Sequence, residues 1–266
     1  MSPQQQLLSR AARRDELQTA PLVFIDADNT LWDTDGVFAA AQLSLLGAVE
    51  KTTGLAGPVE NRLEFVRTFD QQLAQQHHLG LRYPPRLLVD ALALGLRGMP
   101  YGEAARQAWT RGDASRLDRS VVSQIESDFI ADISKQPVLL TGVSRGLREL
   151  SSIGAILVVF TEGSRKRVVR TIEFHQLGEF IYRVFEAPKT VRMFERVKKL
   201  ASADQRIYVI GDQLTRDIQP ANEAGVTTIY IPSGFQPKWE SEAESLPTFQ
   251  AHSFDEAVAF LLRSEG

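Results

Sequence analysis

The chain contains no cysteine among its 266 residues. This absence excludes disulfide bonds, zinc sites built on thiolates, and a cysteine nucleophile. It also fits a reducing compartment, and we expect a cytoplasmic protein.

Long apolar runs and an excess of basic residues are also lacking. No run approaches the roughly 18 apolar residues that span a bilayer, and Met1–Ala20 has no apolar stretch resembling the core of a signal peptide. The net charge is −3 and the pI is near 5.9, so the basic surface of a nucleic-acid-binding protein is not expected. We therefore predict a soluble protein with neither a membrane nor a nucleic-acid partner, whose residues 1–20 form a flexible N-terminal arm.

Short apolar runs, by contrast, recur along the chain and predict buried strands. Alternating with segments of helical periodicity, they indicate a doubly wound, mostly parallel α/β sheet with a Rossmann-like arrangement. The runs are Leu22–Ile25, Ala155–Phe160, Tyr182–Phe185, Ile207–Ile210 and Thr227–Ile231. The last two are separated by a predicted helix over Asp217–Ala224.

A long segment without strand runs interrupts this alternation from about residue 37 to residue 136. Its periodicity predicts helices over Val37–Thr52, Val59–His77, Pro85–Leu96, Tyr101–Trp109 and Ser115–Ile133, with Ser115 as the N-cap of the last. We thus expect an α/β core over residues 21–36 and 137–266 and an inserted helical cap over residues 37–136. The many Ala and Leu residues of the insert could serve a dimer interface, so both a monomer and a homodimer stay open.

Two carboxylates follow the first predicted strand, in Asp26-Ala27-Asp28. Residues i and i+2 of an extended chain point to the same side, so both acids can face one point beyond the strand. Open α/β sheets bind their ligands there, and a divalent cation would relieve the repulsion between two such acids. The alternative is that this stretch is only a polar turn between a strand and a helix.

Polar residues also follow three later strands. Thr161-Glu162-Gly163 ends the second strand and opens a helix, where backbone N–H groups and a hydroxyl can bind phosphate oxygens. Lys189 lies just beyond the Tyr182–Phe185 strand. Gly211-Asp212 ends the Ile207–Ile210 run, and Asp217 follows five residues later, so that both acids could reach one metal ion. Alternatively, Asp217 only caps the next helix.

Taken in order, these segments resemble the four motifs of the haloacid dehalogenase-like (HAD) hydrolase superfamily. The first motif is Asp26-Ala-Asp28-Asn29-Thr-Leu, in which the fourth residue is usually Gly or Asn. The resemblance covers the α/β core, and the position of the insert is similar to that of the C1-type cap. One departure is Glu162, since the residue after the motif's Thr is usually Asn or Ser; Glu adds a negative charge near the phosphate site.

The resemblance implies a Mg²⁺-dependent phosphatase that acts on a small phosphorylated substrate. Asp26 would be the nucleophile and Asp28 the general acid and base. Thr161, Glu162, Gly163 and Lys189 would surround the phosphoryl group. Mg²⁺ would be held by the carboxylates of Asp26 and Asp212 and the backbone carbonyl of Asp28, with Asp217 binding the ion directly or through one of its ligands. Keeping an acid at position 28 favours phosphate-ester hydrolysis over dehalogenation. A phosphomutase and a catalytically idle scaffold protein are the alternatives.

Overall fold

The structure is a computed structural model that describes residues 19–76, 83–234, 236, 240 and 245–265. The chain forms two compact units, one of residues 1–34 with 137–266 and one of residues 35–136. The N-terminal arm predicted over residues 1–20 falls almost entirely on residues 1–18, outside the described residues.

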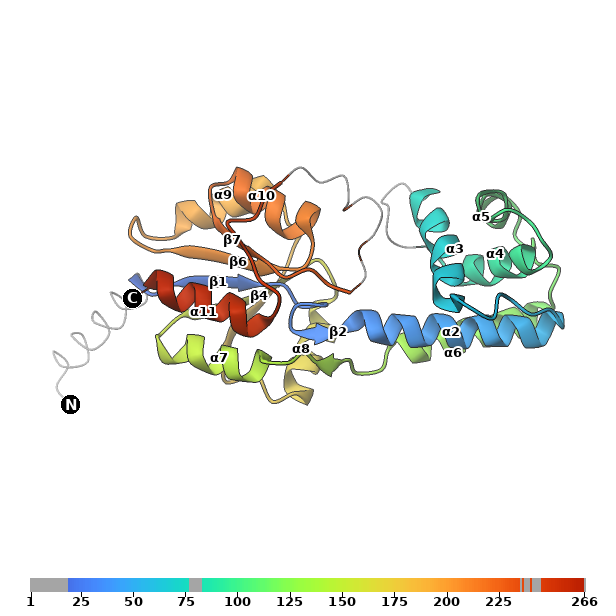
Figure 1. Ribbon diagram of the computed structural model, residues 1–266, viewed down its shortest axis with the longest axis horizontal. Helices are drawn as coiled ribbons and strands as arrows, with labels where there is room; N and C mark the ends of the chain where they lie inside the picture. The colour runs from blue at the N-terminus through green and yellow to red at the C-terminus, as the bar shows by residue number, and fades with distance from the viewer. Residues whose placement is uncertain (1–18, 77–82, 235, 237–239, 241–244, 266) are drawn as a thin grey trace. The chain divides into compact units, whose positions relative to one another are not determined.

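The first unit is built on a six-stranded sheet with the strand order β5-β4-β1-β6-β7-β8 (Figure 1). All neighbouring strands in this sheet are parallel, which confirms the predicted doubly wound α/β fold. The strands are β1 (Leu22–Ile25), β4 (Ile156–Thr161), β5 (Ile181–Glu186), β6 (Ile207–Gly211), β7 (Thr227–Tyr230) and β8 (Phe249–Gln250). The sequence analysis missed β8, which has only two residues.

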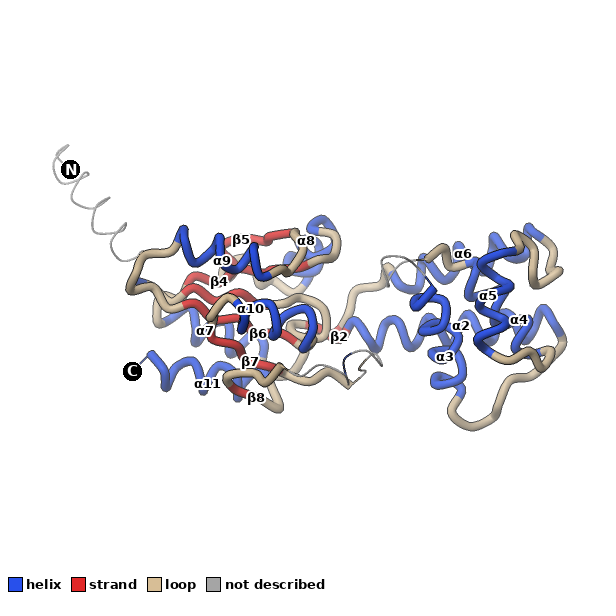
Figure 2. The backbone as a smooth tube through the Cα atoms, turned by 90° about the horizontal axis from the view of Figure 1, so that it is seen from above, coloured by secondary structure: helices blue, strands red, loops and turns tan. Residues whose placement is uncertain are grey.

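Helices cover both faces of this sheet because alternate residues of each strand face opposite sides. Val23 and Ile25 of β1 pack in one core with α7, α8 and α11, whereas Phe24 packs in a second core with α9 and α10 (Figure 2). The helices are α7 (Val143–Ser152), α8 (Arg165–Phe174), α9 (Val191–Leu200), α10 (Gln219–Glu223) and α11 (Phe254–Glu265). Apolar runs without alternation are therefore explained by burial on both faces.

The helix predicted over Asp217–Ala224 begins earlier than expected. A π-helical turn, η1 (Leu214–Ile218), precedes α10 and contains Asp217. The N-cap of α10 is Ile218, so Asp217 does not occupy that position.

A short antiparallel pair lies where the chain leaves and re-enters the α/β unit. Strand β2 (Trp32–Asp33) pairs with β3 (Val138–Leu139), so that Trp32 lies opposite Leu139. This pair was not predicted, because two residues are too few for a pattern to emerge.

The second unit is helical and has its own core. Its helices are α2 (Thr34–Thr53, of which Asp35 onward belongs to this unit), α3 (Arg62–Gln76), α4 (Arg86–Leu96), α5 (Tyr101–Thr110) and α6 (Arg119–Ile133). Helix α4 is buried on nearly all sides, from Leu87 to Leu94. The predicted N-cap of α6 is wrong: the cap is Asp118, whose carboxylate accepts the Ser120 N–H at 2.8 Å, whereas Ser115 is buried and its N–H donates to Asp90. Within the described ranges, no helix is long and apolar enough to cross a bilayer.

Gly95 in α4 provides a test of this helical core. A Cβ at Gly95 would lie 2.2 Å from Cζ of the buried Phe69 ring of α3. We expect Gly95→Ala to lower the free energy of unfolding by about 1–3 kcal/mol through overpacking, measured by urea unfolding. The matched control is Gly47→Ala in α2, where a Cβ meets nothing within 4 Å; the better helix propensity of Ala should raise stability there by about 0.5–1 kcal/mol. Equal stabilities of the two variants would contradict the packing described.

Candidate active site

The neighbouring strands β1 and β6 bring the first two acids together. The chain runs outward from β1 through β4 to β5 and then returns to start again at β6, so the strand order reverses between β1 and β6. Doubly wound sheets bind ligands at the carboxyl ends of strands at such a point. Asp26 directly follows β1, and its N–H still donates to the Ile210 carbonyl of β6 at 2.8 Å. Asp212 directly follows β6.

Asp217 completes a cluster of three carboxylates. Asp26, Asp212 and Asp217 each offer an oxygen within 4.8 Å of the others. Turn η1 fixes Asp217, whose Oδ2 accepts the Gln213 N–H at 3.0 Å. Gly211 allows this close approach, because a Cβ there would lie 2.3 Å from Cγ of Asp217.

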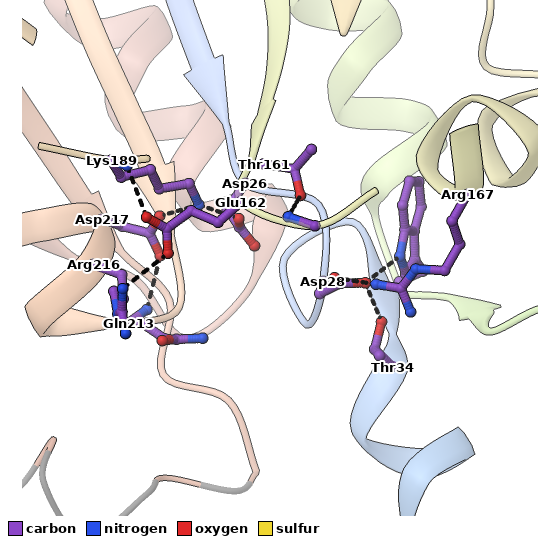
Figure 3. A network of polar contacts seen from close by, with 12 residues as sticks. Asp26, Asp28, Thr34, Thr161, Glu162, Arg167, Lys189, Gln213, Arg216 and Asp217 are labelled. Carbon is purple, nitrogen blue, oxygen red and sulfur yellow. Dashed lines mark hydrogen bonds and ion pairs between the residues drawn. The ribbon is translucent and has the colours of Figure 1, made fainter. Parts of the chain in front are cut away.

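Lys189 lies inside this cluster (Figure 3). Its Nζ forms ion pairs with Oδ1 of Asp26 and, at 2.5 Å, with Oδ1 of Asp217. The lysine is only 8% exposed and lies in the loop between β5 and α9. Burial lowers the pKa of Lys189, but attraction to Asp217 and Asp26 outweighs it and the net shift is upward. The ammonium therefore stays protonated and offsets part of the negative charge.

One lysine does not neutralise the negative charge of the three acids. Burial raises the pKa of Asp26 to about 7; Lys189 opposes this rise, whereas Asp217 and Asp28 add to it. Burial also raises the pKa of Asp212 well above its ordinary value, and its neighbours Asp26 and Asp217 raise it further. Three buried carboxylates thus share one ammonium, which favours a further cation at this position.

Asp212 supplies the observation that tests whether these residues fit a metal ion. Its Oδ1 is buried and has no hydrogen-bond partner among the described residues. An acceptor without a partner is costly unless something occupies its lone pairs. Because Mg²⁺ and Ca²⁺ prefer carboxylate oxygens, the donor set of Asp26, Asp212 and Asp217 fits a hard divalent cation.

The Asp28 carboxylate belongs to a second group of contacts (Figure 3). Its Oδ1 accepts from Nε1 of Trp32 at 3.2 Å and from Oγ1 of Thr34 at 2.6 Å, and its Oδ2 accepts from Nη2 of Arg167 at 2.5 Å. The Asp26 and Asp28 carboxylates therefore bind different partners in this structure, although Asp28 lies close enough to raise the pKa of Asp26. The reason is local: β1 ends at Ile25, and Asn29 then adopts a left-handed conformation with φ of 59°. Asn tolerates this conformation well, which accounts for the residue at this motif position.

The loop after β4 lies between the two groups in Figure 3. The Thr161 hydroxyl oxygen accepts the Gly163 N–H at 2.9 Å, which leaves the hydroxyl hydrogen able to donate to a ligand. Both carboxylate oxygens of Glu162 accept from the protein, one from the Lys189 N–H and the other from Arg216. A carboxylate has no hydrogen to donate to a phosphate. Glu162 therefore offers a phosphate no donor, unlike Thr161 and Lys189.

Arg167 and Arg216 are site residues that the sequence analysis missed. Arg167 lies in the first turn of α8, where the helix dipole disfavours a cation. Arg165, Lys166 and Arg167 all begin this helix, and such a run at a helix start is a signal that could have been noticed. Arg216 stands beside Asp217 in η1, and nothing local marks it.

Comparison with known proteins agrees with this arrangement. Residues 185–257 match the family model described as HAD-hydrolase-like. No curated protein matches the sequence.

Solved structures match nearly the whole chain at low identity. A HAD family hydrolase from Deinococcus radiodurans, with bound phosphate and sodium, has a TM-score of 0.62 at 16% identity, over 93% of this chain and 97% of its own. A haloacid dehalogenase-like family hydrolase from Xanthomonas campestris has a TM-score of 0.60 at 18% identity, over 92% and 96%. The HAD-hydrolase candidate YfnB from Bacillus subtilis, bound to magnesium, has a TM-score of 0.58 at 17% identity, over 91% and 98%.

These structures share the fold, and the family model covers the segment from the end of β5 through Lys189, Asp212 and Asp217 to α11. The family match over residues 185–257 and the shared fold agree with the resemblance to the haloacid dehalogenase-like superfamily that the four motifs carry.

Proposed function

We propose that the protein is a Mg²⁺-dependent phosphatase that hydrolyses a small phosphorylated metabolite through an aspartyl-phosphate on Asp26. The observation that carries this proposal is the Asp26 carboxylate at the end of β1, which contacts Lys189 and lies within 4.8 Å of the Asp212 and Asp217 oxygens. A buried carboxylate beside a lysine and a cation site is suited to attack phosphorus, because its own charge and that of the phosphoryl group are both offset. Bound phosphate in the Deinococcus radiodurans structure and magnesium in YfnB support the same chemistry.

The cation, held by Asp26, Asp212 and Asp217 with the Asp28 carbonyl, would neutralise charge on the phosphoryl oxygens. Lys189 orients the Asp26 carboxylate through its Oδ1 and binds a phosphoryl oxygen. The Thr161 hydroxyl and the N–H groups of the loop after β4 bind the other oxygens. Burial of Asp26 and Lys189 keeps bulk water from the nucleophile.

Asp28 performs the proton transfers. It donates a proton to the departing alkoxide and afterwards takes one from the water that attacks the aspartyl-phosphate. Its carboxylate is 28% exposed, which is open enough for contact with a substrate. Trp32, Thr34 and Arg167 orient it when no substrate is present.

Metal removal tests the first part of this proposal. Phosphate release from a panel of phosphorylated metabolites should require Mg²⁺, fall to background in a chelator, and be inhibited by Ca²⁺, whose larger and more flexible shell disturbs in-line attack. Free Mg²⁺ at about 100 times its Kd should also stabilise the protein by about 2.7 kcal/mol, seen as a higher unfolding midpoint.

Asp212→Asn should abolish both effects, because it replaces the carboxylate whose Oδ1 has no partner among the described residues. The matched control is Asp204→Asn, an exposed acid that precedes the other end of β6; it should behave as wild type. Full activity after exhaustive dialysis against chelator would refute the metal requirement. Phosphoryl transfer to a second substrate hydroxyl without phosphate release would instead indicate a mutase, and inactivity towards every substrate would indicate a scaffold.

Replacing each acid of the first motif by asparagine should impair the activity in a different way. Asp26→Asn lacks the nucleophile, so no substrate should turn over and no phosphate should become attached. Asp28→Asn keeps the nucleophile, and cleavage of an alkyl phosphate, whose leaving oxygen needs a proton, should fall by about 10²- to 10⁴-fold.

An aryl phosphate with an acidic leaving group needs little such help. Rapid-quench measurements on Asp28→Asn should therefore give a burst of phenolate near one equivalent and then a stall, with phosphate on the peptide that contains Asp26. Steady turnover of the aryl phosphate at the wild-type rate would show that Asp28 has no role in proton transfer.

A further inference from the structure

Glu162 connects two separate segments of the candidate site. It follows Thr161 at the end of β4, and its two oxygens accept from different partners: Oε1 from the Lys189 backbone N–H at 2.8 Å, and Oε2 from Nη1 of Arg216 at 3.2 Å (Figure 3). Lys189 lies in the loop beyond β5, and Arg216 lies in the turn η1 beyond β6. One side chain thus ties together the loops that follow three strands.

The first of these bonds fixes the main chain of the lysine loop. The Ala187 N–H donates to the Thr161 carbonyl at 3.1 Å, and two residues later the Lys189 N–H donates to Glu162. Pro188, between them, has no N–H and a fixed φ. The bond to Glu162 therefore anchors the residue whose side chain must reach Asp26 and Asp217.

The second bond fixes the other partner of that lysine. Arg216 immediately precedes Asp217, whose Oδ1 accepts from Nζ of Lys189. The contacts close a ring: Glu162 holds the Lys189 backbone at one end and the neighbour of Asp217 at the other, while Lys189 and Asp217 bind each other directly. The ring closes only if the two segments keep their separation, so the two bonds of Glu162 restrain both of them.

We propose that Glu162 is a positioning residue that holds the Lys189 ammonium between Asp26 and Asp217, and that it does not bind the phosphoryl group. Both of its oxygens are occupied by protein donors, and its charge is paired with Arg216. Glu162 thus takes a place where the resemblance gives Asn or Ser. The effect on turnover rests on the proposed phosphatase activity, whereas the effect on Lys189 itself does not.

Three variants separate the two bonds. Glu162→Ala removes both, Glu162→Gln keeps an acceptor for the Lys189 N–H but loses the charge that pairs with Arg216, and Arg216→Gln leaves Glu162 intact. With an aryl phosphate we expect Glu162→Ala to lower kcat by about 10- to 100-fold, as is common for residues that orient catalytic groups. The other two variants should lose less, and similar, amounts. A direct phosphate ligand would instead mainly raise KM, and Arg216→Gln would then differ from Glu162→Gln.

Lys189 labelling gives a readout that needs no activity. Lys189 is 8% exposed, so acetic anhydride should modify it slowly in the wild-type protein, as followed by peptide mass spectrometry with the exposed Lys135 as internal reference. Glu162→Ala should speed the labelling of Lys189 at least several-fold relative to Lys135. The matched control is Glu186→Ala, which removes another glutamate that accepts a backbone N–H, from Arg165 at 2.6 Å, at the neighbouring strand end.

The outcomes separate the two proposals. Wild-type inactivity would refute the phosphatase, while the labelling would still test Glu162. If the wild type is active and Glu162→Ala matches Glu186→Ala in kcat and in Lys189 labelling, the positioning role is refuted. If Glu162→Ala fails to fold, Glu162→Gln and Arg216→Gln decide: wild-type kcat and wild-type Lys189 labelling in both would overturn the proposal.

Discussion

The contact of Lys189 with Asp26 and Asp217 is the interaction on which the candidate site depends. Three carboxylates are buried at the ends of β1 and β6, where each would lose most of its hydration. A buried charge needs a partner and hydrogen bonds to be tolerated, and this ammonium is the ionic partner of two of the three. The raised pKa of Asp26 shows that one lysine does not suffice, since burial and the other acids outweigh its attraction. This uncompensated negative charge fits the proposal that a divalent cation binds here.

Much of this architecture could be predicted because the signals were local. Leu22–Ile25 and Ile207–Ile210 are apolar runs that end on acids, and parallel strands in a doubly wound sheet bring such ends to one edge. The convergence of Asp26 with Asp212 then follows from strand pairing alone. The register of the two strands also brings their ends level, since Ile25 aligns with Ile210. The helical insert was recognisable for the same reason, through an amphipathic period sustained over its helices.

What could not be predicted depends on contacts between residues far apart in sequence. The orientation of Asp28 depends on Arg167, 139 residues later, and no period or spacing connects them. The two partners of Glu162 lie 27 and 54 residues away. The sequence alone therefore showed only that Glu stands where the motif usually has Asn or Ser. At shorter range, the cap of α6 was misplaced because Ser115 and Asp118 are both good caps; the burial of Ser115 against Asp90 decides between them.

The separation of Asp26 from Asp28 has a chemical consequence. In the proposed mechanism Asp26 is a nucleophile and Asp28 a proton-transfer group, and these two functions need different surroundings. Asp26 is buried against a lysine and two carboxylates, whereas Asp28 is partly exposed and bonded to an indole, a hydroxyl and a guanidinium. A single left-handed residue, Asn29, accompanies the turn that ends the strand and brings Trp32 and Thr34 back towards Asp28. The spacing of the motif thus keeps the two acids close in the chain. The turn after them gives their carboxylates different partners.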